Sequence, residues 1–218
     1  CALYAKDGRE RWVCKTNGAV YSTPVALRHN IFIGCSDNNL YVLEAATGKI
    51  WATVKTDGQI ESKPLITQTS KNATYVTGYI TSKDRFVYCF RLDVKNKDKE
   101  PEILWKFLTK GPLVADPVLV NDMILCGGRD GILYALDRKT GKVIWKKETP
   151  GKYVTTPFVY KNRIYISVGN GTASGRGYVL AYRLNGDEIW RFSADTNISS
   201  AACVYNDKVY VGSDKGII

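Results

Sequence analysis

The side chains that could carry metal-dependent or nucleophilic chemistry are few and scattered. The 218-residue chain has six cysteines and a single histidine, His29. The cysteines form neither a C-x-x-C motif nor an adjacent pair; they are Cys1, Cys14, Cys35, Cys89, Cys126 and Cys203. A zinc site needs clustered sulfur and nitrogen ligands, and a cysteine nucleophile needs a histidine base beside it. The sequence therefore predicts neither a zinc site nor a Cys/His catalytic pair.

A glycine-rich segment, SVGNGTASGRGYV at 167–179, has the composition of a phosphate-binding loop. Such a loop needs the N-terminus of a helix behind it, whereas the YVLAYRL that follows has the pattern of a strand. We therefore interpret this segment as a long surface turn. Its Arg176 becomes a candidate contact for a binding partner.

Five tryptophans could offer flat rings on which a ring-shaped ligand or a nucleic-acid base stacks. They are Trp12, Trp51, Trp105, Trp145 and Trp190, and their separations are 39, 54, 40 and 45 residues. Each ends the same kind of apolar segment. This fixed place favours a structural role, in which the ring fills the wedge between two neighbouring sheets.

The elements that position these residues form an internal repeat of about 40 residues. Each repeat has a segment such as YSTPVAL, then an alternating segment such as IFIGCSD, then a third segment, a tight turn and a fourth segment ending on Trp, as in LYVLEAATGKIW. Alternation with a period of two and β-branched or aromatic residues predict strands. No stretch has the apolar spacing of a helix, so we predict an all-β chain.

Four antiparallel strands per repeat predict a β-propeller with five blades. Residues 198–213 supply only the first two strands of the fifth blade, and residues 1–12 supply a third and a fourth strand. We expect these segments to complete one blade, which would remove two open sheet edges. The prediction is a single propeller domain over 1–218. The alternative is a whole number of repeats taken from a longer array.

The phrases LYALDRKTGKVIW and LYVLEAATGKIW resemble the repeat of the quinoprotein (PQQ-like) β-propellers over essentially the whole chain. That family includes PQQ-dependent alcohol dehydrogenases, assembly lipoproteins of the BamB type, and luminal sensor domains of unfolded-protein-response kinases. It also includes a C-terminal domain of acyl-activating proteins related to aminoadipate-semialdehyde dehydrogenase. The phrase GAVYSTPVALRHNIFIGCSDNNLYVLE is most similar to that last group. The resemblance implies the fold and leaves the function open.

For its dehydrogenases, the resemblance implies PQQ in an axial channel, a calcium ion, a vicinal disulfide and a catalytic Asp. This chain has no adjacent cysteines. The positions before the proline of each first strand are Thr23, Lys63, Asp116, Thr156 and, aligned in the fifth repeat, Ala201. One Asp is little support for calcium, which takes six to eight oxygen ligands. We therefore expect no cofactor and no catalytic residue, and keep a PQQ- and calcium-dependent dehydrogenase as the alternative.

Lys63 and Asp116 hold equivalent positions in adjacent repeats, so they are expected to pair across the channel. The pair is interpreted either as a hydrated salt bridge or as a polar anchor for a ligand.

The loops that precede each first strand share a face with the long glycine-rich turn. We predict that this face, with Lys110, Lys152, Tyr153 and Arg176, binds a protein or peptide, because propellers present functional residues on loops. The formal net charge of +10 favours an acidic partner. The chain would then be a non-catalytic scaffold or an accessory domain of a larger protein.

Other partner classes fit the sequence less well. Specific nucleic-acid binding is not expected, since no basic groove with interleaved aromatic residues is evident. A lectin-like multivalent binder is a further alternative, although Asp, Asn and aromatic residues do not recur together in the repeats. No apolar run approaches the roughly 20 residues that span a bilayer. Unpaired cysteines favour a reducing cytosol and the three Asn-x-Ser/Thr sequons an extracytoplasmic compartment, which leaves the location open.

Overall fold

The computed structural model describes residues 1–172 and 175–216, and these contain strands, turns and loops but no helix. The chain divides into two compact units, Cys1–Lys106 (unit 1) and Phe107–Ile218 (unit 2). The predicted all-β fold of four-stranded antiparallel blades is confirmed. With no helix in the described ranges, none is long and apolar enough to cross a membrane.

Unit 1 carries two four-stranded antiparallel sheets, each with its strands in chain order. The first blade consists of β3 (Val25–Leu27), β4 (Asn30–Gly34), β5 (Asn39–Glu44) and β6 (Ile50–Lys55). The second blade consists of β7 (Leu65–Thr67), β8 (Tyr75–Thr81), β9 (Phe86–Asp93) and β10 (Glu102–Leu108), whose last two residues belong to unit 2. Before them, β1 (Ala2–Leu3) pairs with β2 (Glu10–Trp12) in a sheet of two strands.

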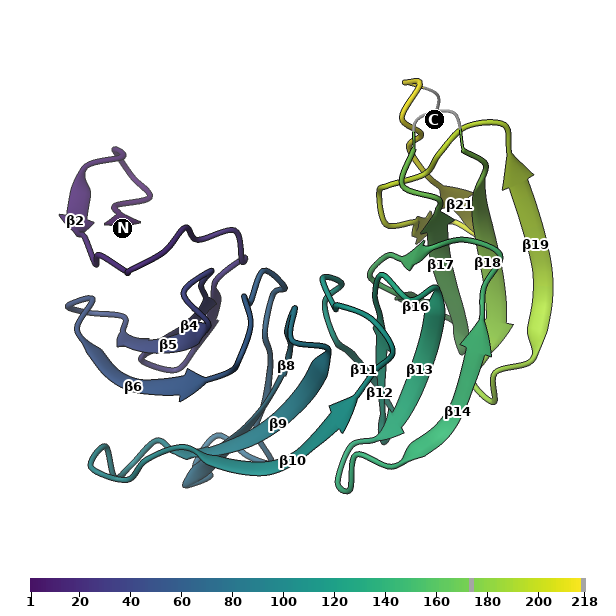
Figure 1. The fold of residues 1–218 in the computed structure, drawn as a ribbon. Helices are drawn as coiled ribbons and strands as arrows, with labels where there is room; N and C mark the ends of the chain where they lie inside the picture. Colours follow the sequence, from purple (N-terminus) through teal and green to yellow (C-terminus); the bar gives the residue numbers. More distant parts are fainter. Residues whose placement is uncertain (173–174, 217–218) are drawn as a thin grey trace. The chain divides into compact units, whose positions relative to one another are not determined.

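Unit 2 continues the same plan. The third blade consists of β11 (Val118–Val120), β12 (Met123–Gly127), β13 (Ile132–Asp137) and β14 (Val143–Glu148), in that order across the sheet (Figure 1). The fourth blade consists of β15 (Tyr153–Val154), β16 (Phe158–Tyr160), β17 (Arg163–Gly169), β18 (Gly177–Arg183) and β19 (Glu188–Ala194). Its two short first strands, β15 and β16, both pair with β17. After them, β20 (Cys203–Tyr205) pairs with β21 (Lys208–Tyr210).

The two-stranded sheets β1–β2 and β20–β21 correspond to the second and the first half of a blade. Their union as a fifth blade, and the single domain over 1–218, stay predictions.

The first strand of each complete blade is shorter than the sequence pattern indicates. The expected segment YSTPVAL begins at Tyr21, whereas β3 begins at Val25, after Pro24. Proline cannot donate to the ladder, and the preceding serine is used elsewhere. Ser22 Oγ donates to the Ser62 carbonyl oxygen at 2.9 Å, and so joins the first and second blades.

The cores lie between neighbouring sheets within each unit. In unit 1, Phe32 and Leu40 of the first blade pack in one buried cluster with Ile80 and Phe90 of the second. In unit 2, Leu133 of the third blade shares a cluster with Ile166 and Leu180 of the fourth. Because the third strand of a blade is covered on both faces, β13 is buried along nearly its whole length. The outer strand β14 instead alternates between exposed and half-buried residues.

Candidate binding surface

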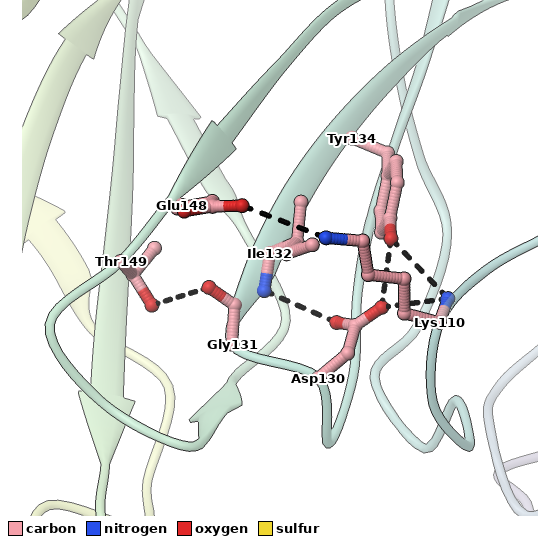
Figure 2. Close-up of polar contacts among 7 residues, drawn as sticks. All are labelled: Lys110, Asp130, Gly131, Ile132, Tyr134, Glu148 and Thr149. Atoms are coloured by element: carbon pink, nitrogen blue, oxygen red, sulfur yellow. Dashed lines mark hydrogen bonds and ion pairs between the residues drawn. The ribbon is translucent and has the colours of Figure 1, made fainter.

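The loops at one end of the third blade are braced by a single carboxylate, Asp130 (Figure 2). Asp130 Oδ2 accepts hydrogen bonds from Tyr134 Oη at 2.8 Å and from the backbone N of Lys110 at 3.1 Å. Its Oδ1 accepts one from the backbone N of Ile132 at 3.1 Å. Asp130 therefore ties the β12–β13 turn to the loop that enters the blade.

The same bracing recurs in the first two blades. Tyr41 Oη donates to Asp37 Oδ2 at 2.6 Å, and Tyr88 Oη donates to Asp84 Oδ2 at 2.7 Å. Burial together with the hydrogen bond to Asp37 raises the pKa of Tyr41 to about 12. The D-x-x-x-Y signature of this bracing is present three times in the sequence but was not recognised before the structure showed its hydrogen bonds. In all three blades the aspartate also accepts a backbone N–H from the preceding loop, and so joins that loop to the turn.

The fourth blade departs from this pattern. Pro150, which aligns with Lys110, has no N–H to donate, and the turn at 169–177 contains no aspartate. The turn is held instead by Asn197, whose Oδ1 accepts the backbone N–H of Asn170 at 2.8 Å. Asn197 Nδ2 also donates to Asp214 at 2.7 Å and to Tyr153 Oη at 3.0 Å. The long glycine-rich turn, of which 173–174 lie outside the described residues, is thus anchored at its start.

The four predicted contact residues differ in their surroundings. Lys110, Lys152 and Arg176 are exposed, and Tyr153 is half-buried. Lys110 Nζ lies 3.6 Å from Glu148 Oε1 at the surface (Figure 2), an ion pair that contributes little to stability. Tyr153 Oη donates to the Ile198 carbonyl oxygen at 3.2 Å, which fixes its ring.

A hollow of about 450 Å³ opens beside these loops in unit 2. Its lining combines one cation, several hydroxyl groups and small apolar side chains: Val114, Ala115, Arg129, Tyr153, Val154, Thr155, Thr156, Gly171, Ser199 and Ala201. Of the four predicted contacts, only Tyr153 lines it. Arg129 is exposed and forms no ion pair with any residue of the described ranges. Arg129 was not singled out from the sequence; it directly precedes Asp130, the first residue of a D-x-x-x-Y signature that was also not recognised there.

The proposed channel pair is split between the units, with Lys63 in unit 1 and Asp116 in unit 2, so its pairing stays a prediction. The backbone N of Asp116 donates to Thr156 Oγ1 at 2.9 Å, which joins the third and fourth blades next to the hollow.

Two tryptophans contact the turn between the third and fourth strands of the next blade. Trp145 Nε1 donates to the Leu184 carbonyl oxygen at 2.9 Å, and a Cβ on Gly186 would lie 2.9 Å from the Trp145 ring. Trp12 Nε1 donates to the Ala45 carbonyl oxygen at 3.1 Å, and a Cβ on Gly48 would lie 2.4 Å from its ring. Both glycines have positive φ, +87° and +73°, so the turn and the ring both require glycine.

The other tryptophans have partners in their own blades, and Trp51 is also contacted by Lys97 of the second blade, whose Nζ lies 5.6 Å from its ring centroid. Trp51 Nε1 donates to Asn30 Oδ1 at 2.9 Å. Trp105 packs against Tyr79 with ring centroids 5.9 Å apart, and Trp190 packs against Tyr165 with centroids 6.1 Å apart. Trp190 also borders the buried cluster that contains Val204 of β20.

The cysteines are unpaired throughout the part of the chain that the structure describes. Cys35, Cys89 and Cys126 are buried, and burial raises the pKa of Cys89 to about 12. Among residues 1–172 and 175–216, no three His, Cys, Asp or Glu side chains gather where they could hold a metal ion.

Antiparallel four-stranded blades, with Trp12 and Trp145 each packed on a turn glycine of the next blade, are the architecture of a PQQ-like β-propeller. The chain belongs to the family described as outer membrane protein assembly factor BamB, which matches residues 92–218. Its fold is similar to that of BamB from Moraxella catarrhalis, with a TM-score of 0.63 and 16% identity over 94% of this chain and 74% of that one. The computationally designed Ika4 protein is similar in fold as well, with a TM-score of 0.61 and 14% identity over 81% of this chain and 98% of that one.

The chain is also similar in sequence to three proteins that are named as enzymes. It is 25% identical to the beta-alanine-activating enzyme of Drosophila melanogaster over 75% of its length, and 24% identical to the tetrathionate hydrolase of Acidithiobacillus ferrooxidans over 92%. A segment covering 34% of the chain is 39% identical to the quinohemoprotein alcohol dehydrogenase ADH IIB of Pseudomonas putida. The matches span 17%, 42% and 12% of these relatives respectively.

Proposed function

We propose that this chain is a non-catalytic binding domain, and that its loop face in unit 2 binds an acidic protein or peptide segment. The observation that carries the proposal is the hollow of about 450 Å³ lined by Arg129 and Tyr153. Propellers of one family host many functions, so the argument rests on this site and not on the fold.

The lining offers a peptide one charge and few hydrogen-bonding groups. Thr155 Oγ1 already donates to the Ser167 carbonyl oxygen, and Ser199 Oγ donates to Asp214. Thr156 Oγ1 accepts from the backbone N of Asp116, so its own hydrogen is left for a ligand carbonyl. The Arg129 guanidinium is left for a carboxylate, which it binds with two parallel hydrogen bonds.

The surrounding surface supports the same partner. Lys110, Lys152 and Arg176 are exposed on the loops of this face, so their positive charges attract an acidic segment during encounter. The small side chains of Ala115 and Ala201 leave room for a peptide backbone in the hollow.

Peptide display followed by fluorescence anisotropy tests the proposal. Peptides selected on the whole chain, with and without Asp or Glu, are titrated against the wild type, Arg129→Gln and the control Lys139→Gln, which removes one positive charge from an exposed turn outside the hollow. We expect acidic peptides to lose about tenfold in affinity with Arg129→Gln and to keep it with Lys139→Gln. Equal loss in both variants, or no selectable peptide, would overturn the proposal.

A second candidate is a segment of a PQQ- and calcium-dependent dehydrogenase, which the match to the Pseudomonas putida enzyme favours. The hollow is a poor fit to calcium, because no lining residue carries a carboxylate and calcium takes six to eight oxygen ligands. Incubation with PQQ and calcium, then desalting and an absorption spectrum, tests this candidate. Retained cofactor absorbance would favour it over the binding domain.

A further inference from the structure

Two arginines of the fourth blade lie directly opposite each other on neighbouring strands. Arg163 begins β17 and Arg183 ends β18, and the two are partners in the antiparallel register. Both side chains are exposed. Like charges directly opposite each other in a sheet are destabilising, so this pair costs stability unless something neutralises it.

The repeat shows that the pair is specific to this blade. The register position of Arg183 is acidic in each of the first three blades: Glu44 opposite Asn30, Asp93 opposite Tyr75, and Asp137 opposite Met123.

The acidic residue at this register position holds the turn that follows it, and the fourth blade holds the equivalent turn with other residues. Asp137 Oδ1 accepts the backbone N–H groups of Lys139 and Thr140, at 3.1 and 2.8 Å, and so holds the following turn. In the fourth blade, Asn185 Oδ1 accepts the backbone N–H of Asp187 at 3.1 Å, and Asn185 Nδ2 donates to Asp187 Oδ2 at 2.8 Å. The turn is therefore held without the acid, and Arg183 is not needed to hold it.

The arginines line a second hollow of about 460 Å³, at the opposite end of β17 from the glycine-rich turn. The lining contains three cations and three asparagine side chains and no carboxylate; it consists of Asn121, Lys161, Asn162, Arg163, Arg183, Leu184, Asn185 and Ile189. Lys161 and Asn162 form a two-residue hairpin turn with φ of +46° and +58°. The backbone geometry of a two-residue hairpin turn is well defined, so the Cβ positions of Lys161 and Asn162 are well defined too.

The carboxylates around this hollow are occupied by other partners. Asp207 is bound by Lys161 at 2.8 Å, Glu188 by Arg191 at 2.8 Å, and Asp122 by Arg138 at 2.8 Å. Asp187 is bound by Asn185. The amide of Asn185 is neutral, but Asp187 forms no ion pair with either arginine: within the described ranges, neither Arg163 nor Arg183 is ion-paired with a carboxylate.

The equivalent hollow of the first blade provides an internal comparison. It is lined by Arg28, His29 and Lys97, but Glu44 lies among them and accepts a hydrogen bond from Lys97. Both hollows are lined by the turn before the second strand and by the end of the third strand of their own blade, where the acid of the first blade is replaced by Arg183 in the fourth. The neighbouring blade contributes differently, through Val94 and Lys97 in the first case and through Asn121 in the second.

We propose that Arg163 and Arg183 form a binding site for a phosphate group, at whose border Lys161 lies already paired with Asp207. Guanidinium groups bind phosphate oxygens through paired hydrogen bonds, and a doubly charged anion relieves the repulsion between the two arginines. Asn162 borders the same hollow, where its amide N–H groups can donate to the remaining oxygens, and Asn185 has one N–H left besides the one that it donates to Asp187. The phosphate is either free or carried on a phosphorylated peptide. The site shares no residue with the loop-face hollow, so a negative result for either site leaves the other proposal unaffected.

NMR titration of the arginine side-chain N–H signals tests the site. Inorganic phosphate, a phosphoserine peptide and its unphosphorylated form are added to the whole chain at constant low ionic strength, with acetate as a singly charged comparison. We expect saturable shifts of Arg163 and Arg183 with phosphate, and weaker ones with acetate. A tighter response to the phosphopeptide than to inorganic phosphate identifies the peptide-borne source, and the reverse identifies free phosphate.

Variants separate a built site from general positive charge. Arg183→Asp restores the acid that the other blades carry, and is expected to lower phosphate affinity at least about tenfold while the blade stays folded. Arg11→Gln removes a charge from β2 and serves as the control, with unchanged affinity expected. No saturable shift in the wild type, or equal weakening by Arg11→Gln, would overturn the proposal.

Discussion

Replacing Asp130 with alanine removes three hydrogen-bond acceptor contacts at once. The carboxylate bonds Tyr134 Oη at 2.8 Å, the Lys110 N–H at 3.1 Å and the Ile132 N–H at 3.1 Å. Tyr134 and Ile132 are each only 3% exposed, so water cannot replace their partner without opening the turn. Lys110 is exposed, and water can satisfy its N–H.

The expected cost follows from the two buried donors. A buried donor left without an acceptor costs about 1–3 kcal/mol, so the loss of the acceptor for two such donors in Asp130→Ala should lower the free energy of unfolding by about 2–6 kcal/mol. Tyr134→Phe removes the hydroxyl donor itself, so no buried donor is left without an acceptor. It should lower the free energy of unfolding by about 1 kcal/mol. The double variant should cost less than the sum of the two, because the residues share one hydrogen bond.

Urea unfolding followed by tryptophan fluorescence measures these free energies. Asp122→Ala is the matched control, because it removes an aspartate whose ion pair with Arg138 is exposed and contributes at most about 1 kcal/mol. If Asp130→Ala and Asp122→Ala destabilise the protein equally, the inference that Asp130 braces the loops is wrong.

Three further predictions follow from local geometry. Gly186→Ala should lower the melting temperature by about 4–8 °C in calorimetry, because φ is +87° and the new Cβ meets Trp145 at 2.9 Å; an unchanged temperature would contradict that contact. The pKa of Tyr41, raised from 10.0 to about 12, means that the native state holds this proton more tightly than the unfolded state. Its stabilising contribution is complete below pH 10 and lost between about pH 10 and 12, which the tyrosinate absorbance of the wild type and Tyr41→Phe would show. A thiol reagent should label the exposed Cys203 in the native protein. Cys89 is 1% exposed and has a pKa of about 12, so it should be labelled only after unfolding. Labelling of Cys89 in the native protein would contradict its burial.

The sequence was sufficient for the repeat and for most of the strands. The tryptophan spacing and the alternating segments fix four strands per repeat, since each strand has one face against a neighbouring sheet. The short first strand was misjudged, because Ser22 contributes to a bond between blades and Pro24 cannot contribute to the ladder. Tyr153 was singled out because its loop precedes the first strand of the fourth repeat; it lines the hollow, and its contact with a partner stays a prediction.

The remaining site residues depend on contacts that a single sequence does not display. Arg129 lies in a turn 24 residues before Tyr153 in the sequence. Only the folded loops bring the two residues to the lining of the same hollow. The pairing of Arg163 with Arg183 depends on the register between β17 and β18, and a shift of one residue would separate the two side chains to opposite faces.

Backbone NMR of unit 2 residues in the labelled whole chain, with a selected acidic peptide, tests the binding-domain account most directly. The account predicts that shifts concentrate at Arg129, Tyr153 and Thr156, and that Arg129→Gln weakens them about tenfold. Shifts confined to the outer strands β14 and β19, with Arg129→Gln binding as the wild type does, would contradict it.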